Sequence, residues 1–218
     1  MIPDPLRLAI ALLPIAVYCL LIGVVNARRR PFLTTGGCDL AALGAALSGL
    51  VLIGPIELFR PEATRIEFGR YVWLFLLLFY WLWVWLAVLL TRPRMVVYNA
   101  SIDELRPVLS EAARKVDPQA RWAGDSLALP TLGVQAHLES FDLMRHVSIV
   151  SSGARQKLEG WRALSAEMHN QLDELPVRPN PRSLGLFLIA TALVAVCMAR
   201  LLASPQEVAQ AMGEMFLF

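Results

Sequence analysis

Four stretches of the chain are apolar over about twenty residues each, and a polar segment of about ninety residues separates the third from the fourth. An α-helix rises 1.5 Å per residue, so about twenty apolar residues cross the ~30 Å hydrocarbon core of a bilayer. We therefore predict four transmembrane helices, at about 6–25, 40–59, 71–91 and 183–203.

The polar segment 92–182 alternates between strand-like and helix-like patterns, which predicts a folded domain. Ser101 and Glu104 form a capping box at the start of the first helix, and Pro107 predicts a distorted first turn or a later start. The expected strands are 95–99, 120–123, 126–129, 134–140 and 146–151, and the expected helices are 101–116 and 158–175.

This order of elements predicts an antiparallel sheet with both helices on one face, a small α+β domain. In outline it resembles the ferredoxin-like class, at the level of element order alone. After the fourth span, Ser204, Pro205 and Glu207 predict the start of an amphipathic helix over 204–218. The fold class is therefore a four-helix membrane protein with an inserted α+β domain.

The composition agrees with a membrane location. Hydrophobic residues make up 56% of the chain and charged residues 17%, below the roughly 25% of soluble domains.

Arginines near the predicted span ends set the orientation, because such residues stay on the cytoplasmic side. Seven lie on the side of the polar domain and three in the short loop 60–70, which predicts outside termini and a cytoplasmic domain 92–182. We expect a plasma membrane, the inner membrane of a bacterium.

The seven arginines are also candidate membrane-surface contacts, since anionic headgroups attract basic residues beside a bilayer. They are Arg28, Arg29, Arg30, Arg92, Arg94, Arg178 and Arg182. The alternative is that they serve only to set the topology, and both interpretations can hold together.

Small residues mark one face of the second span. Gly44, Ser48 and Gly49 allow close approach of another helix, because small residues let helix backbones meet in lipid. This candidate packing face predicts either an interface with a partner or second copy, or packing against other spans of the same chain.

The end of the second span holds a candidate intramembrane polar pair. Glu57 follows a Gly54–Pro55 break and precedes Arg60 by one helical turn. Ionisable groups in spans mark ion pathways in many membrane proteins, which gives the alternative function of a small transporter or channel subunit. An interfacial ion pair is the other interpretation of Glu57 and Arg60.

No pattern of catalytic or metal-binding residues accompanies these features. His137, His146 and His169 lack the close spacing of zinc ligands, so we predict no metal, no cofactor and no enzyme activity. Residues 92–182 hold twelve basic and eleven acidic residues, a balance of +1 that disfavours nucleic acid. We expect a protein that acts by interaction, as scaffold, assembly factor or regulatory subunit of a membrane complex. Its partners would be the bilayer and a membrane protein or a second copy.

Overall fold

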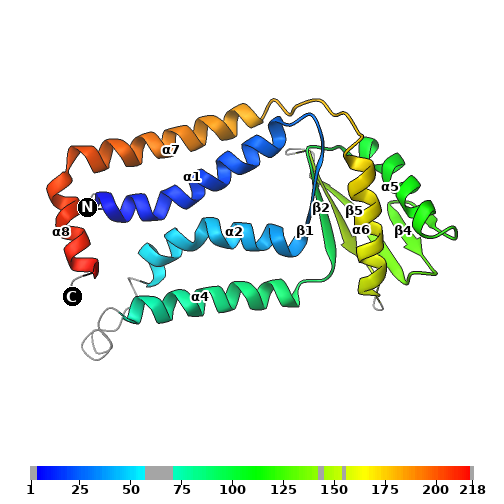
Figure 1. Ribbon diagram of the computed structural model, residues 1–218, viewed down its shortest axis with the longest axis horizontal. Coiled ribbons are helices and arrows are strands. Elements are labelled where there is room, and N and C mark those ends of the chain that lie inside the picture. Colours follow the sequence, from blue (N-terminus) through cyan, green and yellow to red (C-terminus); the bar gives the residue numbers. More distant parts are fainter. Residues whose placement is uncertain (1–3, 57–70, 142–144, 154–155, 217–218) are drawn as a thin grey trace. The chain divides into compact units, whose positions relative to one another are not determined.

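The computed structural model describes residues 4–56, 71–141, 145–153 and 156–216, and the chain divides into two compact units. Residues 1–22, 40–89 and 184–218 form the helical unit, and residues 23–39 and 90–183 form the sheet domain. The chain passes between the units four times, at 22/23, 39/40, 89/90 and 183/184. Figure 1 labels the elements of both units.

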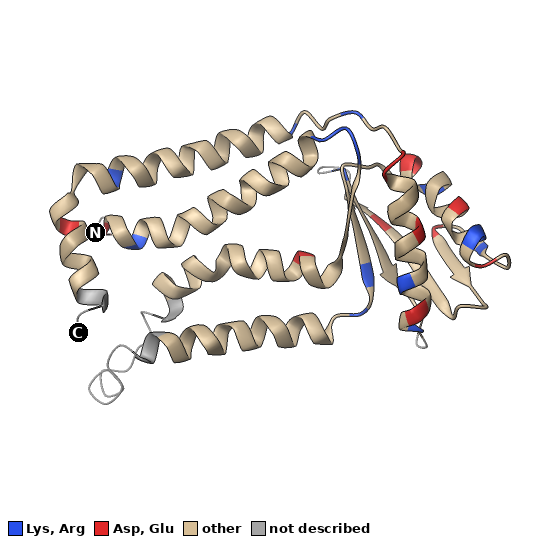
Figure 2. Ribbon diagram, in the orientation of Figure 1, with Lys and Arg blue, Asp and Glu red and all other residues tan. Residues whose placement is uncertain are grey.

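The helical unit takes its residues from long apolar helices. They are α1 (Pro5–Ala27), α2 (Gly36–Val51) with the π-helical turn η1 (Leu52–Ile56), α4 (Tyr71–Leu90) and α7 (Ser183–Ala203), followed by the shorter helix α8 (Pro205–Phe216). Residues 23–27, 36–39, 90 and 183 of these helices belong to the sheet domain. Figure 2 shows that these helices carry few charged positions. The helix α8 follows Ser204, as the sequence predicts.

Within the described residues, three helices are long and apolar enough to cross a membrane, namely Pro5–Ala27, Gly36–Gly54 and Ser183–Ala203. In α4, the apolar part among the described residues is Leu74–Leu90. This part is shorter than the helix length needed to count as a candidate span. The predicted number of four spans is therefore not confirmed, whereas three of the predicted positions coincide with helices of sufficient length.

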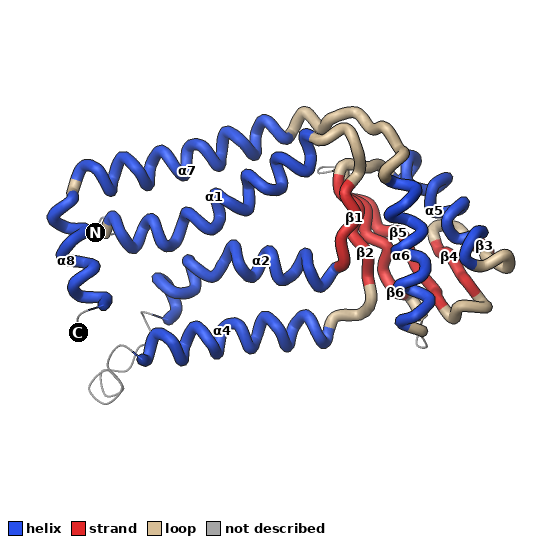
Figure 3. The backbone as a smooth tube through the Cα atoms, in the orientation of Figure 1, coloured by secondary structure: helices blue, strands red, loops and turns tan. Residues whose placement is uncertain are grey.

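The sheet domain is built on six antiparallel strands in the order β1-β2-β6-β5-β4-β3, drawn in red in Figure 3. The strands are β1 (Phe32–Thr35), β2 (Arg94–Tyr98), β3 (Arg121–Ala123), β4 (Ser126–Leu129), β5 (Val134–Phe141) and β6 (His146–Ser151). Five of them follow the predicted strands to within a few residues. The turn between β3 and β4 falls at Gly124, whose φ of 61° suits glycine.

The first strand, β1, comes from a segment that the sequence pattern treats as a loop between two helices. Phe32 pairs with Tyr98 and Thr35 with Met95, so β1 covers the edge of β2. Four residues are too few to show a hydrophobic period, and pairing with β2 supplies the hydrogen bonds that define the strand. The sheet therefore extends outside the range 92–182.

The ferredoxin-like outline is not confirmed. That class repeats a strand–helix–strand unit, whereas here four consecutive antiparallel strands, β3 to β6, follow α5 (Ile102–Val116). The helix α6 (Leu158–Leu172) comes next, and the described residues between α6 and α7 form no strand. The supported description is a six-stranded antiparallel sheet with helices.

The core lies between one face of the sheet and the helices α5 and α6. Leu105 and Leu109 of α5 and Leu164 and Met168 of α6 are buried against alternate residues of the strands, among them Ile149. These helical positions recur at spacings of four, which places them on one face of each helix. The amphipathic pattern thus predicts the faces that become the core.

The capping box at the start of α5 forms as predicted, with Ser101 and Glu104 bonded reciprocally to each other's backbone. The later helix start expected from Pro107 is wrong, because α5 begins at Ile102 and continues through the proline, and the distorted first turn stays a prediction. Pro107 removes one backbone hydrogen bond of α5, and the capping box supplies two hydrogen bonds at the start of the same helix. The second helix ends at Leu172, three residues before the predicted end.

Candidate functional site

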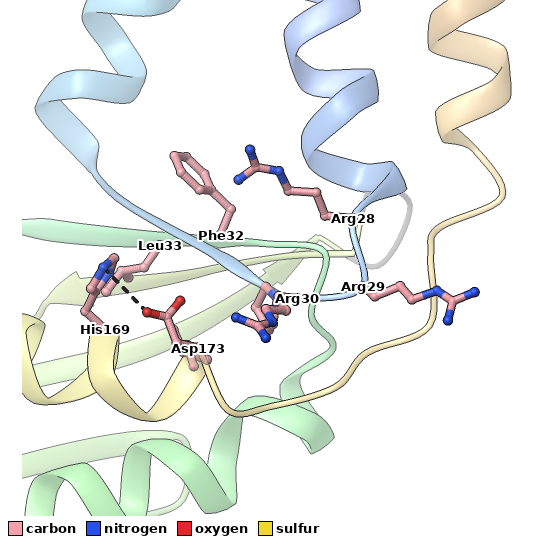
Figure 4. Close-up of a pocket in the computed structure, with 9 residues that line it drawn as sticks. Arg28, Arg29, Arg30, Phe32, Leu33, His169 and Asp173 are labelled. Atoms are coloured by element: carbon pink, nitrogen blue, oxygen red, sulfur yellow. Dashed lines mark ion pairs between the residues drawn. The ribbon is translucent and has the colours of Figure 1, made fainter.

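A pocket of about 450 Å³ lies within the sheet domain, beside the loop that carries the first three candidate arginines. Its lining consists of Arg28, Arg29, Arg30, Pro31, Phe32, Leu33, His169, Leu172 and Asp173. Figure 4 shows the side chain of Arg28 beside Phe32 and the side chain of Arg30 beside Asp173, whereas Arg29 points away from these residues. We call this the basic pocket.

Buried asparagines hold the backbone of this loop in place. Asn99, fully buried with a φ of 59°, donates its side-chain amide to the carbonyl oxygen of Arg28 at 2.7 Å. Asn180 bonds Asn26 twice, from its backbone N–H at 2.9 Å and from its side-chain amide at 3.2 Å. The loop is therefore bound to two distant parts of the chain before any ligand is considered.

A further backbone bond completes the support of the loop. The N–H of Val177 donates to the carbonyl oxygen of Arg29 at 2.9 Å. Because hydrogen bonds anchor the backbone at Asn26, Arg28 and Arg29, the loop position is set while the three arginines remain exposed. Such preorganisation lowers the entropic cost of binding a ligand.

The basic pocket carries an excess of positive charge. Asp173 lies 4.0 Å from His169, and within the described part of the chain no carboxylate pairs with Arg28, Arg29 or Arg30. Three arginines against one aspartate leave a net charge of +2 with His169 neutral. Guanidinium groups bind planar or tetrahedral oxyanions through two hydrogen bonds at once, so the arrangement suits an anion.

Arg94 has a different environment from the loop arginines. Its Nη2 lies 3.4 Å from Oδ2 of Asp39, and its side chain occupies the space in which a Cβ at Gly36 would stand. This arginine therefore holds the start of α2 against β2 within the sheet domain. Arg92, Arg178 and Arg182 are exposed and lie outside the basic pocket's lining.

Asp39 belongs to a polar cluster that the sequence analysis missed. Tyr98 donates its hydroxyl to Oδ1 of Asp39, and the Tyr98 ring stacks on His146 with centroids 4.9 Å apart. Burial lowers the pKa of His146, and the nearby Arg94 lowers it further, against the opposite effect of Asp39. The pairing of β2 with β6 places Tyr98 beside His146, a register that no local sequence signal predicts.

Two other acidic groups support the fold. Burial alone would raise the pKa of Asp117, yet backbone N–H groups of Gln119 and Thr131 donate to its carboxylate and lower the pKa on balance. For Glu104, burial likewise acts to raise the pKa, and the Ser101 backbone and Arg145 outweigh it and lower the pKa. Arg145 bonds both oxygens of Glu104, at 2.9 and 2.7 Å.

The small residues of α2 lie at contacts with other helices of the helical unit. A Cβ at Gly44 would stand 2.8 Å from Val84 of α4, and a Cβ at Gly49 would overlap the backbone carbonyl of Ile10 in α1. Tyr80 of α4 also donates its hydroxyl to the Gly44 carbonyl at 2.6 Å. Ser48 bonds Ala45 of its own helix. Packing within one chain thus occupies Gly44 and Gly49.

The polar pair Glu57 and Arg60 lies outside the described residues. The helix before it changes at Leu52–Ile56 to the π-helical turn, at the site of the predicted Gly54–Pro55 break. Gly54 has open space where its Cβ would be.

The described residues form no group of three or more His, Cys, Asp and Glu side chains able to hold a metal ion. Comparison with known protein families, curated proteins and solved structures finds no match to this chain.

Proposed function

We propose that this chain is a membrane protein of four spans that holds a small cytoplasmic domain at the membrane surface and acts there by interaction. Its role would be that of a scaffold, assembly factor or regulatory subunit in a membrane complex. The observation that carries the proposal is the shortness of the connections between the sheet domain and the apolar helices.

Those connections limit how far the sheet domain can move from the ends of the helices. Four residues separate α1 from β1, none separates β1 from α2, and three separate α4 from β2. At about 3.5 Å per extended residue, three residues reach only about 10 Å. Wherever the helices cross a bilayer, the domain stays within that distance of the headgroups. A folded domain tied in this way can recognise proteins that share its membrane.

The internal design of the domain supports the same role. The carboxylates of Asp117 and Glu104 accept hydrogen bonds from backbone and side-chain partners, and these bonds hold helix ends and loops in place. Its surface keeps some large apolar side chains exposed, including Phe141 and Leu158. Exposed apolar side chains on a tethered domain are natural contacts for a protein partner.

Native mass determination tests the proposal. The full chain would be extracted from its own membrane in mild detergent, with a photo-crosslinking residue at Phe141 or Leu158 and, as matched control, at the exposed Leu188 of α7. A heteromeric mass with protein crosslinks from the domain positions supports it. A lone monomer that crosslinks only to lipid from every position overturns it.

The π-helical turn favours a second candidate, a small transporter or channel subunit. Such turns occur frequently at functional sites of membrane and soluble helices, and this one immediately precedes Glu57. Flux through liposomes containing the purified protein would be compared for the natural chain and Glu57→Gln. Flux that depends on Glu57 supports the transporter, and equal flux through protein-free liposomes rejects it.

A further inference from the structure

We infer that the basic pocket binds the phosphate group of an anionic lipid, with Arg28 and Arg30 as its ligands. The inference deepens the proposed function, and it rests on that proposal only for the location of the domain at the membrane surface. It assigns a ligand class to a site for which the sequence alone predicts general attraction to headgroups.

The lining matches both chemical parts of a phospholipid headgroup region. Arg28 and Arg30 supply donors for phosphate oxygens, whereas Phe32, Leu33 and Leu172 supply an apolar wall for the adjoining glycerol and first methylene groups. A volume of about 450 Å³ lies within the range of small-ligand sites and accommodates one headgroup. A soluble phosphate would use the arginines and leave the apolar wall without a partner.

The geometry distinguishes the three arginines. Figure 4 shows Arg28 beside Phe32 and Arg30 beside Asp173, with Arg29 directed away from the other labelled residues. The bond from Asn99 to Arg28 and the bond from Val177 to Arg29 hold the backbone in the arrangement that produces this alternation. A general attraction to anionic lipid would use all three arginines equally, whereas a site uses two of them more than the third.

A substitution at Asp173 should strengthen lipid binding, whereas the arginine substitutions should weaken it. The carboxylate of Asp173 lines the pocket and would repel a phosphate. Asp173→Asn removes that repulsion, so it should strengthen the binding of an anionic headgroup. A variant that had merely lost its structure would not bind more tightly.

The experiment measures lipids retained by the full-length protein. The protein would be placed in nanodiscs of equal parts phosphatidylglycerol and phosphatidylcholine, released, and analysed by native mass spectrometry for the ratio of the two retained lipids. The double variant Arg28→Gln with Arg30→Gln should lower the enrichment of phosphatidylglycerol roughly 30-fold, at about fivefold for each arginine near the surface.

Two sets of controls give the result its meaning. Arg114→Gln with Arg162→Gln removes the same charge from exposed positions on α5 and α6 and should leave the enrichment unchanged. Arg29→Gln should reduce the enrichment less than Arg30→Gln, and Asp173→Asn should raise it severalfold. Equal losses in the pocket and control doubles, or no loss in the pocket double, would overturn the inference.

A competition experiment distinguishes a lipid phosphate from a soluble phosphate as the ligand. Millimolar glycerol 3-phosphate or inorganic phosphate should leave the enrichment intact, and displacement of the lipid by either compound would show that the site takes a soluble phosphate instead.

The inference and the proposed function fail independently. A monomer with enriched phosphatidylglycerol contradicts only the interaction proposal, and a heteromeric complex without enrichment contradicts only the lipid site.

Discussion

The helical unit and the sheet domain use apolar side chains in opposite ways. In the helical unit large residues point outward, with Leu89 exposed to 78% and Leu188 to 71%. In the sheet domain Leu105, Leu109 and Leu164 are fully buried. Leucine is therefore exposed on the apolar helices, where it would suit a bilayer, and fills a closed core in the sheet domain.

This difference shows what holds each unit together. The domain gains stability from apolar area removed from water and from a side-chain network that includes Asp117 and the buried asparagines. Under our proposal that the apolar helices lie in lipid, they gain no such hydrophobic drive against one another, and their association would depend on close contacts at small residues such as Gly44 and Gly49. Substitutions in the two units should consequently act by different mechanisms.

Truncating a buried leucine should have the largest effect. Leu164→Ala removes a fully buried side chain of α6 and leaves a cavity, so it should lower the free energy of unfolding of the sheet domain by about 2–5 kcal/mol. Leu188→Ala, the matched change on an outward-facing position of α7, should cost under about 0.5 kcal/mol. Chemical denaturation of the detergent-solubilised protein, followed by circular dichroism and by tryptophan fluorescence, measures both. Equal costs would contradict the difference between the units.

Replacing the buried carboxylate should have the next largest effect. Asp117→Asn exchanges a charged acceptor of two N–H groups for an amide, at a cost of about 1.5–3 kcal/mol at neutral pH. Asp125→Asn, at an exposed pair with Arg106, should cost under about 0.5 kcal/mol.

The pH dependence of stability provides the check for Asp117. Its pKa is lowered in the folded state, so the stabilisation is present above the ordinary carboxyl pKa of about 4 and is lost as the pH falls through the folded value. The acid side of the stability profile should flatten in Asp117→Asn. An unchanged profile would mean that the carboxylate contributes nothing through its charge.

A methyl group at a helix contact should disrupt the helical unit. Gly49→Ala places a Cβ against the Ile10 carbonyl, a backbone atom that cannot rotate aside, and should cost about 1–3 kcal/mol. Gly54→Ala is the control, because its Cβ enters open space. Thermal unfolding in detergent compares the two, and similar melting temperatures would show that the contact of α1 with α2 contributes little.

The smallest effect should come from a single hydrogen bond between two helices. Tyr80→Phe removes the hydroxyl that donates to Gly44 at 2.6 Å, and bonds of this kind in membrane proteins average about 0.6 kcal/mol. Phe79→Leu, at an exposed position on the same helix, should be neutral. A cost above that of Gly49→Ala would make polar bonds, and not small residues, the main link between the helices.

Local signals in the sequence account for most of the elements. The capping box at Ser101 predicts the first residue of α5, and the apolar spacing in α6 predicts the buried face with Leu164 and Met168. Both depend on residues within a few positions of one another, which is why a single sequence suffices. The basic loop Arg28–Arg30 is visible in the same way, as three adjacent charges.

The pocket around that loop required information that local patterns do not carry. His169 and Asp173 lie about 140 residues away along the chain, and they line one pocket with Arg28 and Arg30 because β1 pairs with β2 and α6 packs beside it. The bonds from Asn99 and Asn180 to the Asn26–Arg28 segment depend on the same pairing. The strand order departs from the ferredoxin-like outline. It likewise depends on which distant segments of the chain pair with one another.

The sequence by itself determined the apolar helices, the amphipathic faces and the charge of the basic loop, because each follows from side-chain chemistry at short spacing. Only the tertiary structure decided that β1 joins the sheet, that Asp39 meets Tyr98 and that the three loop arginines line one pocket with His169 and Asp173. The physical reason is that a hydrogen bond or contact between distant segments depends on which edge and which register the whole chain selects, and many registers satisfy the same local pattern.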